Sequence, residues 1–570
     1  MFKKKKINNV PWAKYYPDGQ VHLEYSEGSL YDEVEKTAYL YPKYYAYNYF
    51  GKKATYQQFL LQIETIAKAF CQLGVEKGDI VTICMPNTPE AIISFYALNK
   101  IGAIANVIHP LSAENEIKYY LNVSNSKYLL AIDLAYNKIK NIINETKVQK
   151  TIIVSVSESM PTILNIGYNI TQGYKNRINS KENVINWKNF KALANKYFGN
   201  TKANAKKDDC AAILYSGGTT GKPKGIILTN LNFNAVAKQC TVACGFLKPQ
   251  DTLLAILPIF HGFGLGICIH TVLTNGATSI LIPQFNARKF DELLNKYHPN
   301  IIIGVPTLYE ALLKNKSMNR VDLSYLKGAI SGGDSLSTTL KKEVDKFFKE
   351  HNANIQIREG YGLTECASAS CLTPINMYKE GSIGVPLPDM NYKIVVPNTD
   401  KELPTGEIGE IIISGPSVMA GYLNEEVETN LTLQKHKDGN IWLHTGDLGY
   451  MDSDGFVFFK QRLKRMIVSS GYNVYPSQIE EIINRHKDVL TSTVIGIPHP
   501  YKVQVAKAYI VLKPNVKTSK NKIKEDIMEL CQKNLARYSL PYEIEFRESL
   551  PKTKIGKVNY KELEQENINL

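Results

Sequence analysis

The segment 211–225 reads Ala-Ala-Ile-Leu-Tyr-Ser-Gly-Gly-Thr-Thr-Gly-Lys-Pro-Lys-Gly, an apolar run followed at once by glycines, hydroxyls and lysines. Glycines let backbone N–H groups approach an anion, while hydroxyl and ammonium groups add donors and positive charge. This pattern predicts a polyphosphate-binding loop at the end of a buried strand. It is not a Walker A loop, because Ser216 stands where that motif needs a glycine and Pro223 where it needs Ser or Thr. A flexible connector is the alternative, which the closing Pro-Lys-Gly disfavours.

The sequence on both sides of this loop alternates between helical and strand patterns. Thr55 and Gln58 form a capping-box pattern before a predicted helix, whose apolar residues recur every three or four positions until Gly74. Short apolar runs typical of buried parallel strands stand at 80–83, 152–154 and 301–303. These strand–helix units predict an α/β protein with a large N-terminal domain of parallel-rich sheets and helices on both faces.

The pattern changes after about residue 461, where a basic cluster precedes a smaller α+β run. Ser477 and Glu480 indicate a second capping box with a helix behind it. A further helix is predicted near 522–535, and strands are predicted at 494–495, 509–512 and 544–546. We therefore expect two domains, 1–461 and 462–570, joined by a basic hinge. The stretch from about 168 to 207, rich in Asn and Lys, shows no clear core pattern.

The composition is that of a folded protein of 570 residues with more than one domain. Lys and Arg number 68 against 54 Asp and Glu, and this net charge of +14 is spread along the chain. No basic stripe with interleaved aromatic residues is legible, so nucleic-acid binding is the weaker explanation and a solvated cationic surface the plainer one.

Nine scattered cysteines without CxxC spacing, and no apolar segment after the lysines at 3–6, predict reduced thiols in the cytoplasm. Glycine, proline and histidine interrupt the uncharged stretch 252–287, where we expect a buried strand–turn–helix–strand passage instead of a membrane span.

Six further motifs follow the glycine-rich loop in order: Pro-Ile-Phe-His-Gly-Phe-Gly at 258–264, Ser-Gly-Gly-Asp-Ser-Leu at 331–336, Gly-Tyr-Gly-Leu-Thr-Glu at 360–365, Thr-Gly-Asp at 445–447, Gln-Arg-Leu-Lys at 461–464 and Pro-Lys-Thr-Lys-Ile-Gly-Lys at 551–557. Together they resemble the adenylate-forming superfamily of acyl- and aryl-CoA ligases, luciferases and peptide-synthetase adenylation domains. The match runs from about residue 50 to 563. It implies that a carboxylate attacks the α-phosphate of MgATP to give acyl-adenylate and pyrophosphate, after which a thiol displaces AMP. It also implies that the C-terminal domain is mobile.

The resemblance also implies the site residues. The catalytic set is Lys557, His261, Thr364 and Glu365, and the Mg²⁺ ligands are Thr219 and Glu365. Nucleotide and CoA binding falls to Ser216, Gly217, Gly218, Thr219, Thr220, Gly221, Lys224, Gly332, Gly333, Asp334, Gly360, Tyr361, Gly362, Asp447, Arg462, Lys464 and Gly471. Within that set Tyr361 stacks on adenine, Asp447 accepts from the ribose hydroxyls and Arg462 supports the ribose. Lys557 reaches both the attacking carboxylate and the α-phosphate.

Each of these residues has a plainer explanation outside its motif. Lys557 alone would be one of many surface lysines, Asp447 a turn residue and His261 a core histidine. Within the motif, His261 is a neutral imidazole beside the substrate carboxylate that can respond to a proton or a charge. The sequence Asp-Ser-Asp-Gly at 452–455 superficially suggests a calcium loop, but it lacks the remaining ligands, so we expect a hairpin turn.

Several positions depart from the family pattern. Gly217 stands where many relatives have Ser, and Asp334 occupies a position that is usually small and apolar. Glu359 replaces a common Gln and is expected to put a negative charge near the nucleotide. Ser470 stands where some aryl-CoA ligases carry Lys, which puts one CoA contact in doubt. Lys464 is a variant of the hinge residue that alternates with Asp.

The expected acyl pocket is apolar, which favours an alkyl acid over an aryl one. By family position it is lined by Ile259, Phe260, Phe263, Gly264, Val305, Pro306, Thr307 and Leu308. The segments at 331–336 and 304–309 are similar to bacterial long-chain acyl-CoA ligases. The 13 residues after Lys557 hold no carrier-protein domain, and Gly471 could border a pantetheine tunnel, so coenzyme A is the expected acceptor.

We therefore expect ATP- and Mg²⁺-dependent ligation of a medium- or long-chain fatty acid to coenzyme A. A ligase that loads a separate carrier protein and an aryl-CoA ligase are the alternatives, and a catalytically inactive relative is disfavoured by Glu365 and Lys557. The net charge of +14 suits peripheral contact with anionic membranes. The sequence leaves monomer and homodimer open.

Overall fold

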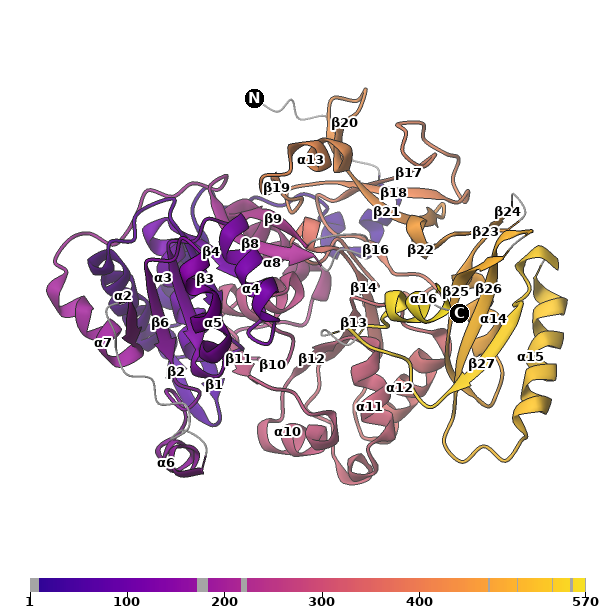
Figure 1. The fold of residues 1–570 in the computed structure, drawn as a ribbon, viewed down its shortest axis with the longest axis horizontal. Helices are drawn as coiled ribbons and strands as arrows, with labels where there is room; N and C mark the ends of the chain where they lie inside the picture. The colour runs from indigo at the N-terminus through magenta and orange to yellow at the C-terminus, as the bar shows by residue number, and fades with distance from the viewer. Residues whose placement is uncertain are drawn as a thin grey trace.

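The computed structural model describes residues 10–171, 183–216, 223–469, 472–499, 501–535, 537–553 and 557–568. Within these ranges the strands form four sheets, with helices packed on and between them (Figure 1). In the same ranges, no helix combines the length and the apolar character needed to cross a membrane.

Two large sheets make up most of the N-terminal part. The nine-stranded sheet has the order β16 (Val385–Pro386), β15 (Cys371–Leu372), β14 (Ile357–Tyr361), β13 (Gly328–Gly332), β12 (Ile301–Gly304), β10 (Thr252–Ala255), β11 (Thr278–Leu281), β1 (Tyr45–Tyr49) and β2 (Lys52–Thr55). The eight-stranded sheet has the order β19 (Gly421–Tyr422), β9 (Lys224–Thr229), β8 (Cys210–Ser216), β4 (Ile104–Val107), β3 (Ile80–Cys84), β5 (Tyr128–Ile132), β6 (Lys150–Val154) and β7 (Val184–Asn186). Central neighbours such as β12 with β13 and β3 with β4 are parallel. The parallel-rich α/β architecture is confirmed.

Helices pack against both sheets. Every residue of α3 (Pro89–Ile101) is buried, as are most of α8 (Asn230–Cys244), and both helices share one hydrophobic core with the two sheets. A helix buried all round carries apolar residues on every side, as these two do. The other helices of this part are α1 (Leu30–Leu40), α2 (Tyr56–Leu73), α4 (Glu114–Val123), α5 (Tyr136–Ile142), α6 (Thr162–Thr171), α7 (Trp187–Ala192), α9 (Val272–Thr274), α10 (Phe290–Tyr297), α11 (Pro306–Lys314), α12 (Thr338–Glu350) and α13 (Glu426–Thr432).

Local signals at the start of the chain are confirmed. The side chain of Thr55 accepts from the N–H of Gln58 and the side chain of Gln58 accepts from the N–H of Thr55, so α2 begins with the expected capping box. The helix ends at Gly74, whose φ of 94° is in the left-handed region that favours glycine. The passage 252–287 runs as β10, a π-helical segment over Phe263–Thr271, α9 and β11, as expected.

Two expectations are wrong. The stretch 168–207 does contribute to the core, because Trp187 and Phe190 of α7 are buried and Phe190 packs against Phe70; its residues 172–182 lie outside the described part. The C-terminal capping box does not form, because the helix begins two residues earlier than a cap at Ser477 requires, with Pro476 at its first position and Tyr475 before it. Proline has no N–H and a fixed φ, so it begins the helix in place of a side-chain cap.

A third sheet lies above the two large ones (Figure 1). Its order is β17 (Asn391–Val395), β18 (Gly409–Ser414), β21 (Ile441–Met451) and β20 (Leu433–Lys435), with β22 (Val457–Arg462) paired to β21. The turn between β21 and β22 is the expected hairpin, in which Asp452 Oδ1 accepts from the N–H groups of Asp454 and Phe456.

The C-terminal part has a sheet and a core of its own. The sheet has the order β24 (Tyr472–Val474), β23 (Ile467–Ser469), β26 (Val503–Leu512) and β25 (Val489–His499), with β27 (Glu543–Arg547) beside β26. It is accompanied by α14 (Pro476–Asn484), α15 (Lys520–Asn534) and α16 (Tyr560–Ile568). Residues of β23, α14, β25, β26 and α15 form a separate hydrophobic cluster. The α+β character is confirmed, whereas the domain boundary at residue 461 remains a prediction.

Candidate functional site

One cavity of about 1750 Å³ gathers most of the predicted site residues, from segments far apart in the chain. Its lining includes Lys224, His261, Gly332, Gly333, Asp334, Gly360, Tyr361, Gly362, Thr364, Glu365, Asp447, Arg462 and Lys557. Residues 217–221 of the phosphate loop and Gly471, with Ser470 beside it, lie outside the described residues, and so do the side chains of Ser216 and Lys464. The backbone of Ser216 pairs with Lys224, so the loop leaves β8 and rejoins β9 at the cavity wall.

The parallel strands explain why these motifs meet. Gly332 closes β13 and Tyr361 closes the neighbouring β14, at the carboxyl edge where α/β sheets bind ligands. A β-carbon on Gly332 would lie 3.1 Å from the carbonyl oxygen of Gly360 and 3.2 Å from the Phe263 ring. Glycine at position 332 therefore lets the motifs at 258–264, 331–336 and 360–365 close on one another.

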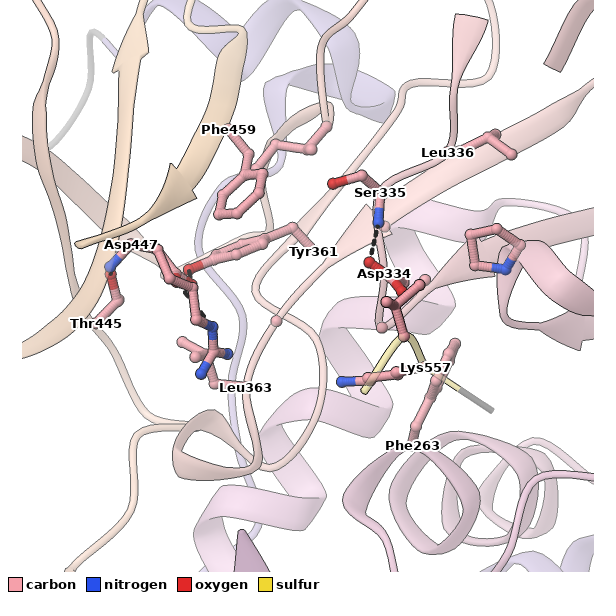
Figure 2. A pocket seen from close by; sticks show the side chains of 18 of the residues that line it. Phe263, Asp334, Ser335, Leu336, Tyr361, Leu363, Thr445, Asp447, Phe459 and Lys557 are labelled. Carbon is pink, nitrogen blue, oxygen red and sulfur yellow. Dashed lines mark hydrogen bonds and ion pairs between the residues drawn. The ribbon is translucent and has the colours of Figure 1, made fainter. Parts of the chain in front are cut away.

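Asp447 lies beside Tyr361 in the lining of the cavity (Figure 2). Asp447 lies opposite Arg462 in the pairing of β21 with β22, and its Oδ1 is 3.3 Å from Arg462 Nε. The hydroxyl of Tyr361 donates to Asp447 Oδ2 at 2.7 Å. Burial raises the pKa of Asp447, and the nearby Arg462 guanidinium opposes that rise. The geometry thus offers an aromatic face beside a paired, buried carboxylate.

Lys557 enters the cavity from the C-terminal part and lies beside Asp334 (Figure 2). A β-carbon placed on Gly333 would be 3.6 Å from Lys557 Cε, and Gly333 has a φ of 79°. Burial lowers the pKa of Lys557, while Asp334 acts against that shift. The Asp334 carboxylate accepts from the N–H of Ser335 at 2.9 Å. An ammonium group is therefore held at the junction of the two domains.

His261 is neutral in this site. Burial, with Lys557 nearby, lowers the pKa of His261 to about 3. Its Nδ1 accepts from the N–H of Phe263 at 3.2 Å. The neutral imidazole agrees with the expectation, but a proton response does not, because at this pKa the ring stays neutral at any pH where the protein would work.

Glu365 lies in a polar cluster that the sequence did not reveal. The hydroxyl of Tyr422 donates to Glu365 Oε1 at 3.1 Å. Lys224 lies 5.1 Å from the centre of the Tyr422 ring and forms an ion pair with Glu428 of α13. Tyr422 belongs to a two-residue strand, which is too short to leave a periodic pattern in the sequence.

These residues suit a Mg²⁺ ion held mainly by phosphate oxygens. The described residues contain no group of three or more His, Cys, Asp or Glu that could hold a metal ion. Mg²⁺ at phosphate-transfer sites is commonly held by one or two carboxylates, with waters and substrate phosphates completing the shell. Glu365 fits that pattern, while Thr219, the other expected ligand, lies outside the described residues.

The Glu359 carboxyl does not carry the expected negative charge. Burial raises the pKa of Glu359 to about 8, and its Oε1 accepts from the N–H of Leu336 at 3.0 Å. At neutral pH the carboxyl is therefore mostly protonated. A protonated carboxyl both donates and accepts hydrogen bonds, as does the glutamine that it replaces.

Glu359→Gln is expected to change how stability depends on pH. The pKa is raised from 4.5 to about 8 on folding, so wild-type stability falls as pH rises through that window. The glutamine variant lacks this titration. Its free energy of unfolding relative to that of the wild type should therefore increase with pH, by a total of about 1.4 kcal/mol for each unit by which folding raises the Glu359 pKa. Urea-unfolding midpoints at pH 5, 7 and 9 measure it, with the exposed Glu350→Gln as control. A constant gap at all three pH values would refute the buried titration.

Part of the cavity wall is apolar. It is lined by Phe260, Phe263, Ile267, Ile303, Ile330, Cys240, Cys244, Cys371 and Leu372. Of the expected acyl residues, Phe260, Phe263, Pro306 and Thr307 line the cavity, whereas Ile259, Gly264, Val305 and Leu308 do not appear in its lining. Ile259 and Leu308 are packed into hydrophobic cores. Cys240, Cys244 and Cys371 contribute to the apolar wall instead. The spacing of cysteines in the sequence does not predict this role.

Comparisons with known proteins agree over nearly the whole chain. Residues 34–423 match the family described as AMP-binding enzyme, and residues 478–557 match the AMP-binding enzyme C-terminal domain. A long-chain-fatty-acid–CoA ligase of Bacillus subtilis (strain 168) is 33% identical over 98% of each chain. A probable 4-coumarate–CoA ligase 1 of Dictyostelium discoideum is 30% identical over 89% of each. The solved structure of a Mycobacterium tuberculosis fatty acyl CoA synthetase has a TM-score of 0.69 at 26% identity, covering 94% of this chain and 98% of that one. The chain therefore belongs to the AMP-binding enzyme family.

Proposed function

We propose that this enzyme joins a medium- or long-chain fatty acid to coenzyme A through an acyl-adenylate, with release of AMP and pyrophosphate. One observation carries the proposal: a single cavity is lined by Tyr361 and Asp447, by a set of apolar side chains and by Lys557. The relative from Bacillus subtilis, named a long-chain-fatty-acid–CoA ligase, supports the same substrate class.

In the first half-reaction a carboxylate oxygen of the acid attacks the α-phosphorus of ATP, and the bond to the pyrophosphate oxygen breaks. Catalysis of such transfers is mainly positioning and charge stabilisation. Tyr361 stacks on the adenine, while Asp447 with Arg462 holds the ribose. Lys557 stabilises the charge that develops between the carboxylate and the α-phosphate. Glu365 and Thr219 would hold Mg²⁺, which neutralises phosphate charge when bound.

In the second half-reaction the thiol of coenzyme A loses its proton to solvent and its sulfur attacks the acyl carbonyl carbon, and the bond from that carbon to the phosphate oxygen breaks so that AMP leaves. The neutral His261 beside Phe263 can lie against the acyl carboxyl without adding charge. We further propose that domains 1–461 and 462–570 act as the two moving parts, because Lys557 comes from the second while most of the cavity comes from the first.

We also propose a cytoplasmic enzyme that makes peripheral contact with membranes. The nine cysteines are free, which suits a reducing compartment. The net charge of +14 suits anionic lipid surfaces, from which fatty acids can be collected. Either a monomer or a homodimer fits the proposal.

The proposal is tested by pyrophosphate release with MgATP and a panel of acids from acetate to palmitate, plus benzoate and coumarate, with and without coenzyme A. We expect turnover on C8–C18 acids and an acyl-CoA product. Turnover of coumarate alone would favour the aryl-CoA ligase that the Dictyostelium relative is named for. Adenylate formation without transfer to coenzyme A would favour a carrier-protein acceptor.

A further inference from the structure

The strand pairing around Asp447 is irregular. The register of β18 against β21 shifts between positions 410 and 412, where the single residue Ile411 stands against residues 445–447 of β21. Gly446 within this segment has a φ of 66°, in the left-handed region that favours glycine. We call residues 445–447 the bulge. Bulges are common beside active sites because they redirect a side chain. The direction of the Asp447 carboxylate, seen beside Tyr361 in Figure 2, therefore depends on how the bulge is held.

The carboxylate of Glu410 holds the bulge. Its Oε1 accepts from the N–H of Gly446 at 3.0 Å. Its Oε2 accepts from the N–H of Asn398 at 3.0 Å and lies 3.0 Å from Nδ1 of His444. Burial acts to raise the pKa of Glu410, but the hydrogen bonds from His444 and the two N–H groups outweigh it and hold the pKa below its ordinary value. Glu410 is therefore an ionised acceptor with three donors, and its side chain is 2% exposed.

A second histidine supports the first. A carboxylate can only accept, so Nδ1 of His444 carries the hydrogen in its contact with Glu410. The other ring nitrogen of His444, Nε2, lies 3.0 Å from Nε2 of His436. Both rings are buried, and His436 also packs against the ring of Trp442. A buried polar network in which every member has a partner fixes the arrangement of its members, because leaving one of them unpaired costs free energy.

Thr445 secures the other half of the bulge. Its hydroxyl donates to the carbonyl oxygen of Ile411 at 2.5 Å and accepts from the N–H of Asp447 at 3.0 Å. Glu410 and Thr445 thus bind the two consecutive N–H groups of Gly446 and Asp447. Glu410 and His444 line the same cavity as Asp447. Glu410 therefore acts on the Asp447 carboxylate through the backbone of the bulge.

We propose that Glu410, supported by His444 and His436, is a positioning residue that aims Asp447 at the ribose hydroxyls and so makes the enzyme discriminate ATP from 2′-deoxyATP. The inference rests on the proposed contact of Asp447 with the ribose. A site built to bind a hydroxyl rejects an analogue that lacks it, because a buried polar group is then left unpaired. A displaced bulge weakens this contact and leaves the adenine and phosphate contacts in place, so the loss should fall mainly on ATP.

The test compares the wild type with Glu410→Gln in pyrophosphate release from ATP and from 2′-deoxyATP, with palmitate and coenzyme A. Glutamine keeps the shape of the side chain but puts an NH₂ group where one oxygen accepts. We expect kcat/KM for ATP to fall by about 10²-fold, the scale of a misplaced binding group. The preference for ATP over 2′-deoxyATP should shrink by about tenfold, the scale of one hydrogen bond. His444→Phe should shift the preference in the same direction by less, and it carries the test if Glu410→Gln does not fold.

Two further variants separate positioning from stability. In an Asp447→Asn background, Glu410→Gln should change the nucleotide preference no further, because the group that it positions has already been altered. The matched control is Asp251→Asn. Asp251 is likewise buried, accepts from the N–H of Lys248 and pairs with Lys327, but it precedes β10 at the amino end of strands whose carboxyl ends face the cavity. This control should keep the wild-type preference even where it lowers the melting temperature.

An unchanged preference in folded Glu410→Gln, or equal losses on both nucleotides, would overturn the proposal, because Glu410 would then be merely structural. A wild type that uses both nucleotides equally well would refute the ribose contact of Asp447 and the inference with it. Equilibrium dialysis of the two nucleotides measures the same preference without an acid. A preference for ATP that Glu410→Gln abolishes in dialysis, with no acid turned over by any form, would sustain the positioning role and refute the fatty-acid ligase.

Discussion

Lys557→Ala should lower the rate of adenylate formation by about 10²–10³-fold, the usual cost of removing one preorganised donor from a site of developing charge. Lys557 is the ammonium that the C-terminal part places against Gly333 and Asp334. Its loss removes positive charge where the carboxylate and the α-phosphate meet. The KM for ATP should change much less, because Tyr361, Asp447 and Arg462 remain.

The rate is measured as acid-dependent exchange of pyrophosphate into ATP. Lys552→Ala is the matched control, since Lys552 is exposed in the same C-terminal segment. Its rate should equal that of the wild type. An equal loss of exchange rate in both variants would show that the rate depends on the charge or the fold of this segment. It would contradict a direct role of Lys557 in the reaction.

Glu365→Gln should lower kcat by about 10²-fold and raise the Mg²⁺ concentration needed for half-maximal rate. The change keeps the shape of the side chain, and the amide oxygen can still accept from Tyr422. It removes the anionic oxygen that suits Mg²⁺. Activity should therefore recover in part at high Mg²⁺ concentration.

Steady-state rates across a Mg²⁺ titration test this prediction. Tyr422→Phe is the control, because it removes only the hydroxyl that donates to Glu365 at 3.1 Å. It should cost far less than the glutamine substitution. A Glu365→Gln enzyme with reduced kcat and an unchanged Mg²⁺ requirement would place Glu365 outside the metal shell.

Local sequence signals predict the elements that carry the site. The capping box at Thr55 and the stop at Gly74 bound α2 because both depend on neighbouring residues alone. The strands at 80–83 and 301–303 follow from apolar runs that only a sheet covered on both faces can bury. Where two local signals compete, the prediction fails: Pro476 begins α14 two residues before a helix capped by Ser477 would start.

Contacts between distant segments are what the sequence could not supply. Tyr422 meets Glu365 only because a two-residue strand pairs with β9, and Glu428 reaches Lys224 from α13. The protonation of Glu359 follows from its burial, which no residue near it in sequence indicates. Trp187 and Phe190 likewise find their core partners across the fold, from a stretch with a polar composition.

The central claim is tested most directly by product stoichiometry. The wild-type enzyme is given palmitate, MgATP and coenzyme A, and nucleotides, pyrophosphate and thioester are quantified together. The account predicts equal amounts of AMP, pyrophosphate and palmitoyl-CoA. Formation of ADP and phosphate, or of AMP without any thioester, would contradict it.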